Sequence, residues 1–143
     1  MVEWLAGNRI KGTSTERTGA TVAQATPTKI IDGNYTVLTY TADGKFIPKG
    51  SFDVEYLVVA GGGGGGATTG GGGGAGGFRT NVSGATSGGG ASAEATYGVT
   101  AQNYDITIGA GGAGAYSGVD GSAGSDSSIV PASGTSIISL GGG

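Results

Sequence analysis

The chain has 143 residues, of which 35 are glycine, more than three times the usual share of about 7%. Charged residues make up 12%, and both cysteine and histidine are absent, which excludes a disulfide framework, a thiolate metal site and a Ser-His-Asp triad. The net charge of −3 argues against a nucleic-acid surface, and glycine lacks the strict every-third spacing of collagen. We therefore expect a structural or binding protein with no catalytic activity, cofactor or bound metal.

Residues 1–28 form a polar stretch that is poor in apolar side chains. Such a stretch buries little surface of its own, so it predicts either a loosely ordered terminus or an arm that docks on a partner. Tryptophan is enriched as an anchor at interfaces, which favours docking. The docking hypothesis assigns the contact to Trp4, Leu5, Arg9 and Ile10. The start lacks a signal-peptide pattern and the apolar runs are too short to span a bilayer, so we expect no membrane insertion.

Residues 29–60 carry the clearest strand signals. Residues 29–31 lead into an Asp32-Gly33-Asn34 turn, and residues 35–41 then alternate between two faces. Asp43-Gly44 predicts a hairpin before residues 45–47. Residues 52–60 are rich in β-branched and aromatic side chains and predict one long strand. No segment keeps a helical period, so an all-β domain is expected over residues 29–143.

Beyond residue 60 the chain is dominated by glycine. Six glycines lie in residues 1–60, which leaves 29 of the 35 for residues 61–143. Two further strand candidates, residues 104–108 and 135–140, each lead into glycine, as residues 57–60 do. The third of these passages ends at Gly143, and the sequence leaves open whether the natural chain continues.

The glycine runs allow two interpretations. They could be flexible linker, the ordinary behaviour of glycine tracts. Alternatively, runs without Cβ atoms could form extended threefold helices of the polyproline-II type, which order only when several pack side by side and share backbone hydrogen bonds. The packing hypothesis assigns this role to Gly61, Gly62, Gly63, Gly64, Gly65, Gly66, Gly70, Gly71, Gly72, Gly73 and Gly74.

Other motifs are weak. Residues 54–66 superficially match a dinucleotide fingerprint, but no helix follows to bind the pyrophosphate. Asp120 and Asp126 lie among glycines, yet the tandem repeat of a calcium roll is missing, which favours aspartates in turns. Two short glycosylation sequons begin at Asn34 and Asn81, with no secretory leader to support their use.

Residues 52–60 followed by glycines, and the Gly-Gly-Ala-Gly-Gly-Phe-Arg stretch that ends at Arg79, resemble the glycine-rich domain of phage tail-fibre and adhesin-like virion proteins. The likeness covers roughly residues 29–143, and residues 7–18 are similar to leaders of virion-associated proteins. The resemblance implies a small β-sandwich-like domain with polyglycine segments and an extended N-terminal arm, on a surface protein that is often trimeric. In related phage adhesins, loops between glycine helices touch the host receptor. Here residues 67–69 are too short for that role, and the insertions 78–87, 91–108 and 113–129 are better candidates.

Three functions follow from these observations. The first is a structural or attachment component of the virion surface, whose arm binds other virion proteins and whose domain forms a homo-oligomer, most simply a trimer. The second is an adhesin that binds a host-cell receptor or glycan, and the third is a subunit of a non-viral extracellular filament. The residues assigned to receptor contact are Phe78, Arg79, Tyr97 and Tyr116, for which packing or ordinary surface exposure is the competing interpretation.

Overall fold

The fold of this chain is built from short β-strands, as its alternating and β-branched segments predict. The computed structural model describes residues 20–21, 27–116 and 119–143. The only helical element in these ranges is one 3₁₀ turn, Gly88–Gly90, and no helix there is long and apolar enough to cross a membrane. The all-β prediction is confirmed. The strands are β1 (Ala20–Thr21), β2 (Thr28–Asp32), β3 (Tyr35–Thr39), β4 (Gly44–Pro48), β5 (Phe52–Val54), β6 (Leu57–Val59), β7 (Phe78–Thr80), β8 (Thr86–Ser87), β9 (Ala91–Ser92), β10 (Tyr97–Val99), β11 (Tyr104–Thr107), β12 (Ser127–Pro131) and β13 (Ile137–Ser139).

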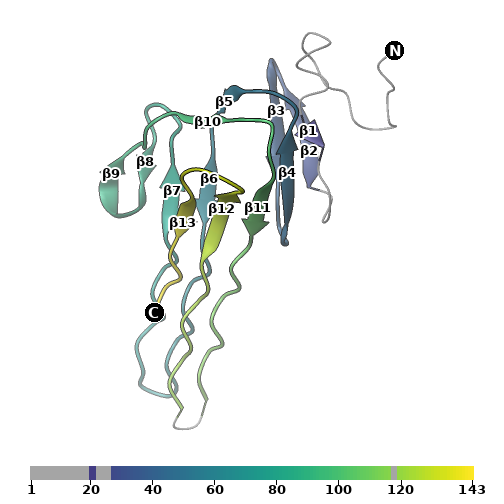
Figure 1. The fold of residues 1–143 in the computed structure, drawn as a ribbon. Coiled ribbons are helices and arrows are strands. Elements are labelled where there is room, and N and C mark those ends of the chain that lie inside the picture. Colours follow the sequence, from purple (N-terminus) through teal and green to yellow (C-terminus); the bar gives the residue numbers. More distant parts are fainter. Residues whose placement is uncertain (1–19, 22–26, 117–118) are drawn as a thin grey trace.

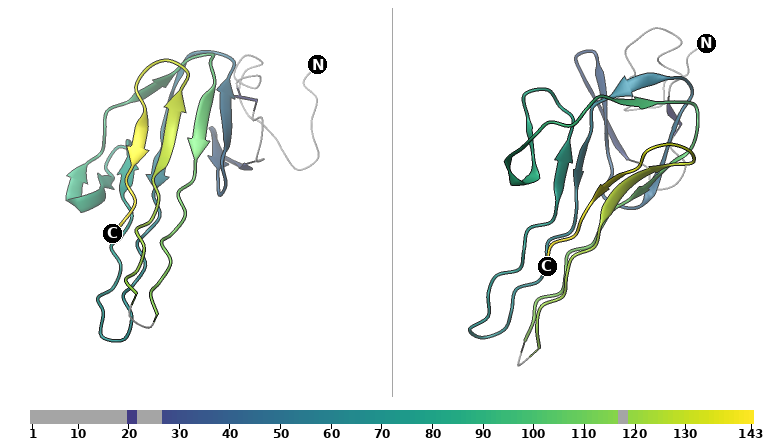
Figure 2. Two further views of the ribbon diagram at one scale, coloured as in Figure 1. Left: turned by 60° about the horizontal axis from the view of Figure 1, so that its bottom comes forward. Right: turned by 60° about the vertical axis from the view of Figure 1, so that its left-hand side comes forward.

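The largest sheet is antiparallel and has the strand order β1-β4-β11-β12-β13. In its central strand, Tyr104 lies opposite Phe46 of β4 and Pro131 of β12. Four smaller antiparallel pairs complete the fold: β2–β3, β5–β10, β6–β7 and β8–β9. Strand β6 packs against β12 and β13, so the β6–β7 pair and the large sheet form two layers (Figure 2).

The apolar core lies between these two layers. Tyr56, Val58 and Ile137 are buried together, and Tyr97 and Ile129 pack against them. Aromatic rings join this cluster to the large sheet. The ring centroid of Tyr97 lies 5.9 Å from that of Tyr56 and 6.5 Å from that of Tyr104, and both pairs have edge-on geometry. Such pairs add about 0.5–1.5 kcal/mol beyond the area that they bury. The core is therefore small and depends on a few tyrosines.

The predicted long strand at residues 52–60 is wrong, because the structure divides it into β5 and β6, which belong to different sheets. The division falls at Glu55 and Tyr56. There the side chain of Asn81 accepts a hydrogen bond from the Tyr56 amide at 2.8 Å and donates one to the Val54 carbonyl at 2.9 Å. Asn81 thus satisfies the backbone where the chain leaves one sheet for the other.

The hairpin predicted at Asp43-Gly44 is also wrong, although the turn at Gly33 forms as expected between β2 and β3. Strand β4 pairs with β1 and β11 rather than with β3. The Asp43 carboxylate instead accepts a hydrogen bond from the Ile108 amide at 2.8 Å, just after β11. The segments that the sequence indicated as insertions contain β7, β8, β9, β10 and most of β12, together with β11, which the sequence also predicted as a strand.

Candidate functional site: the packed glycine segments

Five extended segments lie side by side beyond the ends of the strands, and together we call them the glycine array. They are residues 61–66, 70–77, 109–116, 119–126 and 141–143. Segments 61–66, 109–116 and 141–143 follow β6, β11 and β13, and segments 70–77 and 119–126 lead into β7 and β12. Each segment is therefore anchored by a strand at one end. Figure 1 shows them extending away from the sheets as unlabelled ribbon below β6, β7, β11 and β12.

Residues 61–66 occupy the centre of the glycine array and bond to their neighbours in a strict period of three. The amides of Gly61 and Gly64 donate to segment 119–126, where the backbone carbonyls of Ser125 and Ser122 accept at 3.0 and 2.8 Å. Two residues after Gly61 and Gly64, the amides of Gly63 and Gly66 donate to a different segment, 70–77. Their acceptors are the backbone carbonyls of Gly74 and Gly71, both at 2.8 Å. The carbonyls of Gly62 and Gly65 accept from a third segment, through Gly112 and Ala115 at 2.8 Å. This rotation of partners is the hydrogen-bonding pattern of a threefold extended helix.

The outer segments are also joined to one another. Residues 109–116 and 119–126 are linked because the Ser122 amide donates to Ala113 and the Ser125 amide donates to Ala110, each at 2.9 Å. The short segment 141–143 bridges two others, since Gly142 accepts from Gly124 at 2.7 Å and Gly143 accepts from Gly74 at 2.5 Å. The array is therefore a single hydrogen-bonded unit rather than a set of independent loops.

Close backbone approach explains why glycine recurs in the array. A Cβ atom on Gly61 or Gly64 would overlap the carbonyl oxygen of Ala110 or Ala113. Likewise, a Cβ on Gly121 or Gly124 would overlap the carbonyl oxygens of residues 64 and 61. In segments 109–116 and 119–126 the intervening positions include non-glycine residues, and all of these except Ala115 are exposed. The packing hypothesis named residues 61–66 and 70–74, whereas residues 119–126 lie within the insertion indicated at residues 113–129.

Polar side chains hold the junction between the sheets and the glycine array. The Ser127 hydroxyl accepts a hydrogen bond from the Gly109 amide at 2.8 Å, and the Asp126 carboxylate accepts one from the Gly141 amide at 2.8 Å. Together with the Asp43 contact to Ile108, these bonds satisfy amides where the strand ladders end. Asp126 thus has a structural role, and the described residues contain no group of three or more acidic side chains placed to hold a metal ion.

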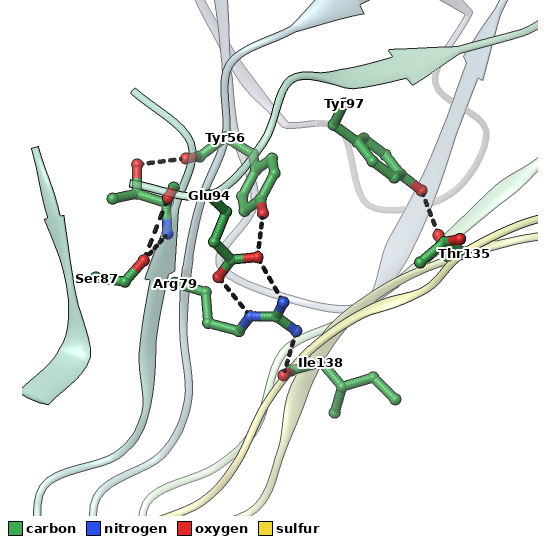
Figure 3. A network of polar contacts seen from close by, with 8 residues as sticks. Tyr56, Arg79, Ser87, Glu94, Tyr97, Thr135 and Ile138 are labelled. Atoms are coloured by element: carbon green, nitrogen blue, oxygen red, sulfur yellow. Dashed lines mark hydrogen bonds and ion pairs between the residues drawn. The ribbon is translucent and has the colours of Figure 1, made fainter. Parts of the chain in front are cut away.

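A partly buried polar network connects the two layers above the array (Figure 3). Arg79 donates to both carboxylate oxygens of Glu94, through Nε at 2.7 Å and Nη2 at 2.5 Å, and through Nη1 to the Ile138 carbonyl at 3.0 Å. The Tyr56 hydroxyl donates to the same carboxylate at 2.8 Å. The hydrogen bonds from Arg79 lower the pKa of Glu94 below its ordinary value. Burial, reinforced by Glu94, raises the pKa of Tyr56 to about 12.

The four residues assigned to receptor contact lie in different environments. Arg79 is held in the network just described, and Tyr97 donates from its hydroxyl to the Thr135 carbonyl at 2.8 Å (Figure 3). Phe78 is partly exposed on β7, opposite Val59 of β6. Tyr116 is 83% exposed, at the end of segment 109–116 that is remote from β11. The structure does not bring the four together, and the docking residues Trp4, Leu5, Arg9 and Ile10 lie outside the described residues.

The fold and the glycine array define an all-β domain in which strands carry a bundle of packed, extended glycine segments. Consistent with this, the sequence matches the glycine-rich domain family over residues 39–143. The chain belongs to this family. Comparisons with curated proteins and with solved structures returned no match.

Proposed function

We propose that this chain is a structural or attachment component of a virus particle, displayed on the virion surface, with no catalytic activity. The observation that carries the proposal is the glycine array itself. It is a projection held by backbone hydrogen bonds between neighbouring segments, and it extends away from the sheets that anchor it (Figure 1). Such a projection suits a protein that must display a surface at a distance from its point of attachment.

The expected partners are other virion proteins, bound through residues 1–28, and further copies of the same chain. A trimer is the simplest assembly that the family resemblance implies, and closed symmetry is usual for homo-oligomers. The small core supports association, because a domain that buries little apolar area gains stability from contacts with its copies.

The test is fractionation of virus particles from a sample that carries this sequence. Peptides of the chain should co-purify with intact particles through a density gradient, at a constant number of copies per particle. Recovery of the peptides only from cells or from free filaments would contradict a virion role, and filaments would favour the alternative of a non-viral filament subunit.

A second candidate function, adhesion to a host surface, is favoured by exposed side chains at the end of the array. Tyr116 is 83% exposed and Val119 is 66% exposed, and these two residues lie at the ends of segments 109–116 and 119–126 that are remote from β11 and β12. Labelled chain should bind host cells, and Tyr116→Ser should weaken that binding. Tyr35→Ser is the matched control, because Tyr35 is an exposed tyrosine on the β2–β3 hairpin. Equal loss with both variants would argue against adhesion through this end.

A further inference from the structure

The central segment of the glycine array has unfilled neighbour positions. A threefold extended helix donates hydrogen bonds in three directions and accepts them in three others, which defines six positions around it. Around residues 61–66, four of these are taken by segments 70–77, 141–143, 119–126 and 109–116. Backbone hydrogen bonds join each of these segments to the next one in this order. Among the described residues, no backbone hydrogen bond joins segment 109–116 to segment 70–77. Two adjacent positions are therefore open, between segments 109–116 and 70–77.

The hydrogen-bonding groups that face the open side follow from the period of three. The amides of Gly61 and Gly64 point to one neighbour and those of Gly63 and Gly66 to another, so the amides of Gly62 and Gly65 point in the remaining direction. Neither of these two amides has a partner among the residues that the structure describes.

The Cβ directions give the same result independently. Cβ atoms on Gly61, Gly63 and Gly64 would overlap backbone oxygens of neighbouring segments. A Cβ on Gly65 would meet nothing nearer than 3.7 Å, and a Cβ on Gly62 nothing nearer than 3.4 Å. These two positions are therefore the ones in the centre of the segment where the fold itself does not require glycine, although the sequence has glycine there.

We propose that this open side is an interface, and that a glycine segment from a second copy of the chain fills it. Segment 70–77 of the partner copy fits the requirement best. Residues 70–75 are all exposed, and a Cβ on Gly71 or Gly72 would have nothing within 4 Å, so this segment presents bare backbone to a neighbour. Residues 60–78 carry no charged side chain, so two such surfaces meet without repulsion. The docked segment would make the same backbone hydrogen bonds that already join the segments of the array. Its close approach would explain why residues 62 and 65 are glycine.

This inference does not depend on a virion role, and amide hydrogen exchange of the whole chain tests it directly. In dilute solution the amides of Gly62 and Gly65 should exchange rapidly, while those of Gly61, Gly63 and Gly64 are protected. At a concentration where light scattering reports association, exchange at Gly62 and Gly65 should slow by at least about tenfold. A chain that stays monomeric, or that associates while these two amides still exchange rapidly, would overturn the proposal.

A pair of variants gives a second readout. Gly65→Ala adds a Cβ that the single chain accommodates but that lies where the incoming segment must pack. It should keep the thermal midpoint of the dilute protein and lose association. Ala123→Val, on an exposed position of segment 119–126, is the control and should associate like the wild type. If Gly65→Ala associates normally, the interface lies elsewhere; if it fails to fold, the exchange measurement on the wild type still decides.

Discussion

The carbonyl oxygen of Ala113 occupies the place where a Cβ atom on Gly64 would lie. Gly64→Val should therefore separate segments 61–66 and 109–116 and break several backbone hydrogen bonds at once. Each buried group left without a partner costs about 1–3 kcal/mol, so we expect a clear drop in the thermal midpoint or loss of the fold. The control is Thr68→Val, in the exposed turn at residues 67–69, which keeps a β-branched side chain at the same positive φ and should change stability by about 0.5 kcal/mol or less. Equal thermal midpoints for the two variants would show that the glycine runs are only a spacer.

The ion pair between Arg79 and Glu94 should make stability depend on pH in the acid range. The pKa of Glu94 in the fold lies below its ordinary value of 4.5, so the paired carboxylate stabilises the fold fully above that pH. This stabilisation is lost as pH falls through the lowered pKa. Glu94→Gln should cost about 1–2 kcal/mol at pH 7, a figure reduced because about a third of the Arg79 side chain is exposed. Urea unfolding at pH 7 and pH 3 should show the wild type and the variant converging at the lower pH, and a constant difference would contradict this role.

Asn81 should be essential for the change of sheet between β5 and β6. Asn81→Ala removes the partners of the Tyr56 amide and the Val54 carbonyl, and we expect a loss of about 1–3 kcal/mol in the free energy of unfolding. Asn34→Ala, at the exposed turn between β2 and β3, removes the same side chain without those contacts. Denaturant unfolding of both variants is the measurement, and similar losses would mean that the Asn81 bonds contribute little.

Residues 1–19 should serve assembly rather than folding. Their removal leaves β1 paired with β4 and every described strand in place, so the shortened chain should keep its circular dichroism spectrum and thermal midpoint. If the docking hypothesis holds, it should no longer join its particle, and Trp4→Ala in the full chain should weaken incorporation in the same direction. Normal incorporation of the shortened chain would refute the docking arm.

Some features of this fold could be predicted from the sequence because their causes are local. Alternation at residues 35–39 and 104–107 gives β3 and β11, and near-pure glycine beside apolar strands indicates backbone packing. The division between β5 and β6 could not be predicted, because it depends on Asn81, about 25 residues further along the chain. Segment 119–126 was missed because only every third residue must be glycine there. Gly121 and Gly124 carry that signal, and the serines, alanine and aspartates around them obscure it.

The glycine array joins its segments without apolar side chains between them, and this has a consequence for how its stability changes with temperature. Exposure of apolar surface raises the heat capacity of unfolding, whereas exposure of polar groups lowers it. Unpacking residues 61–66 from their neighbours exposes mainly amides and carbonyls, so the array should add little to the heat-capacity change of the domain. Its contribution should therefore weaken less on cooling than that of an apolar core of equal size. The stability curve of the chain should be flatter toward low temperature than that of a domain of the same size held by an apolar core alone.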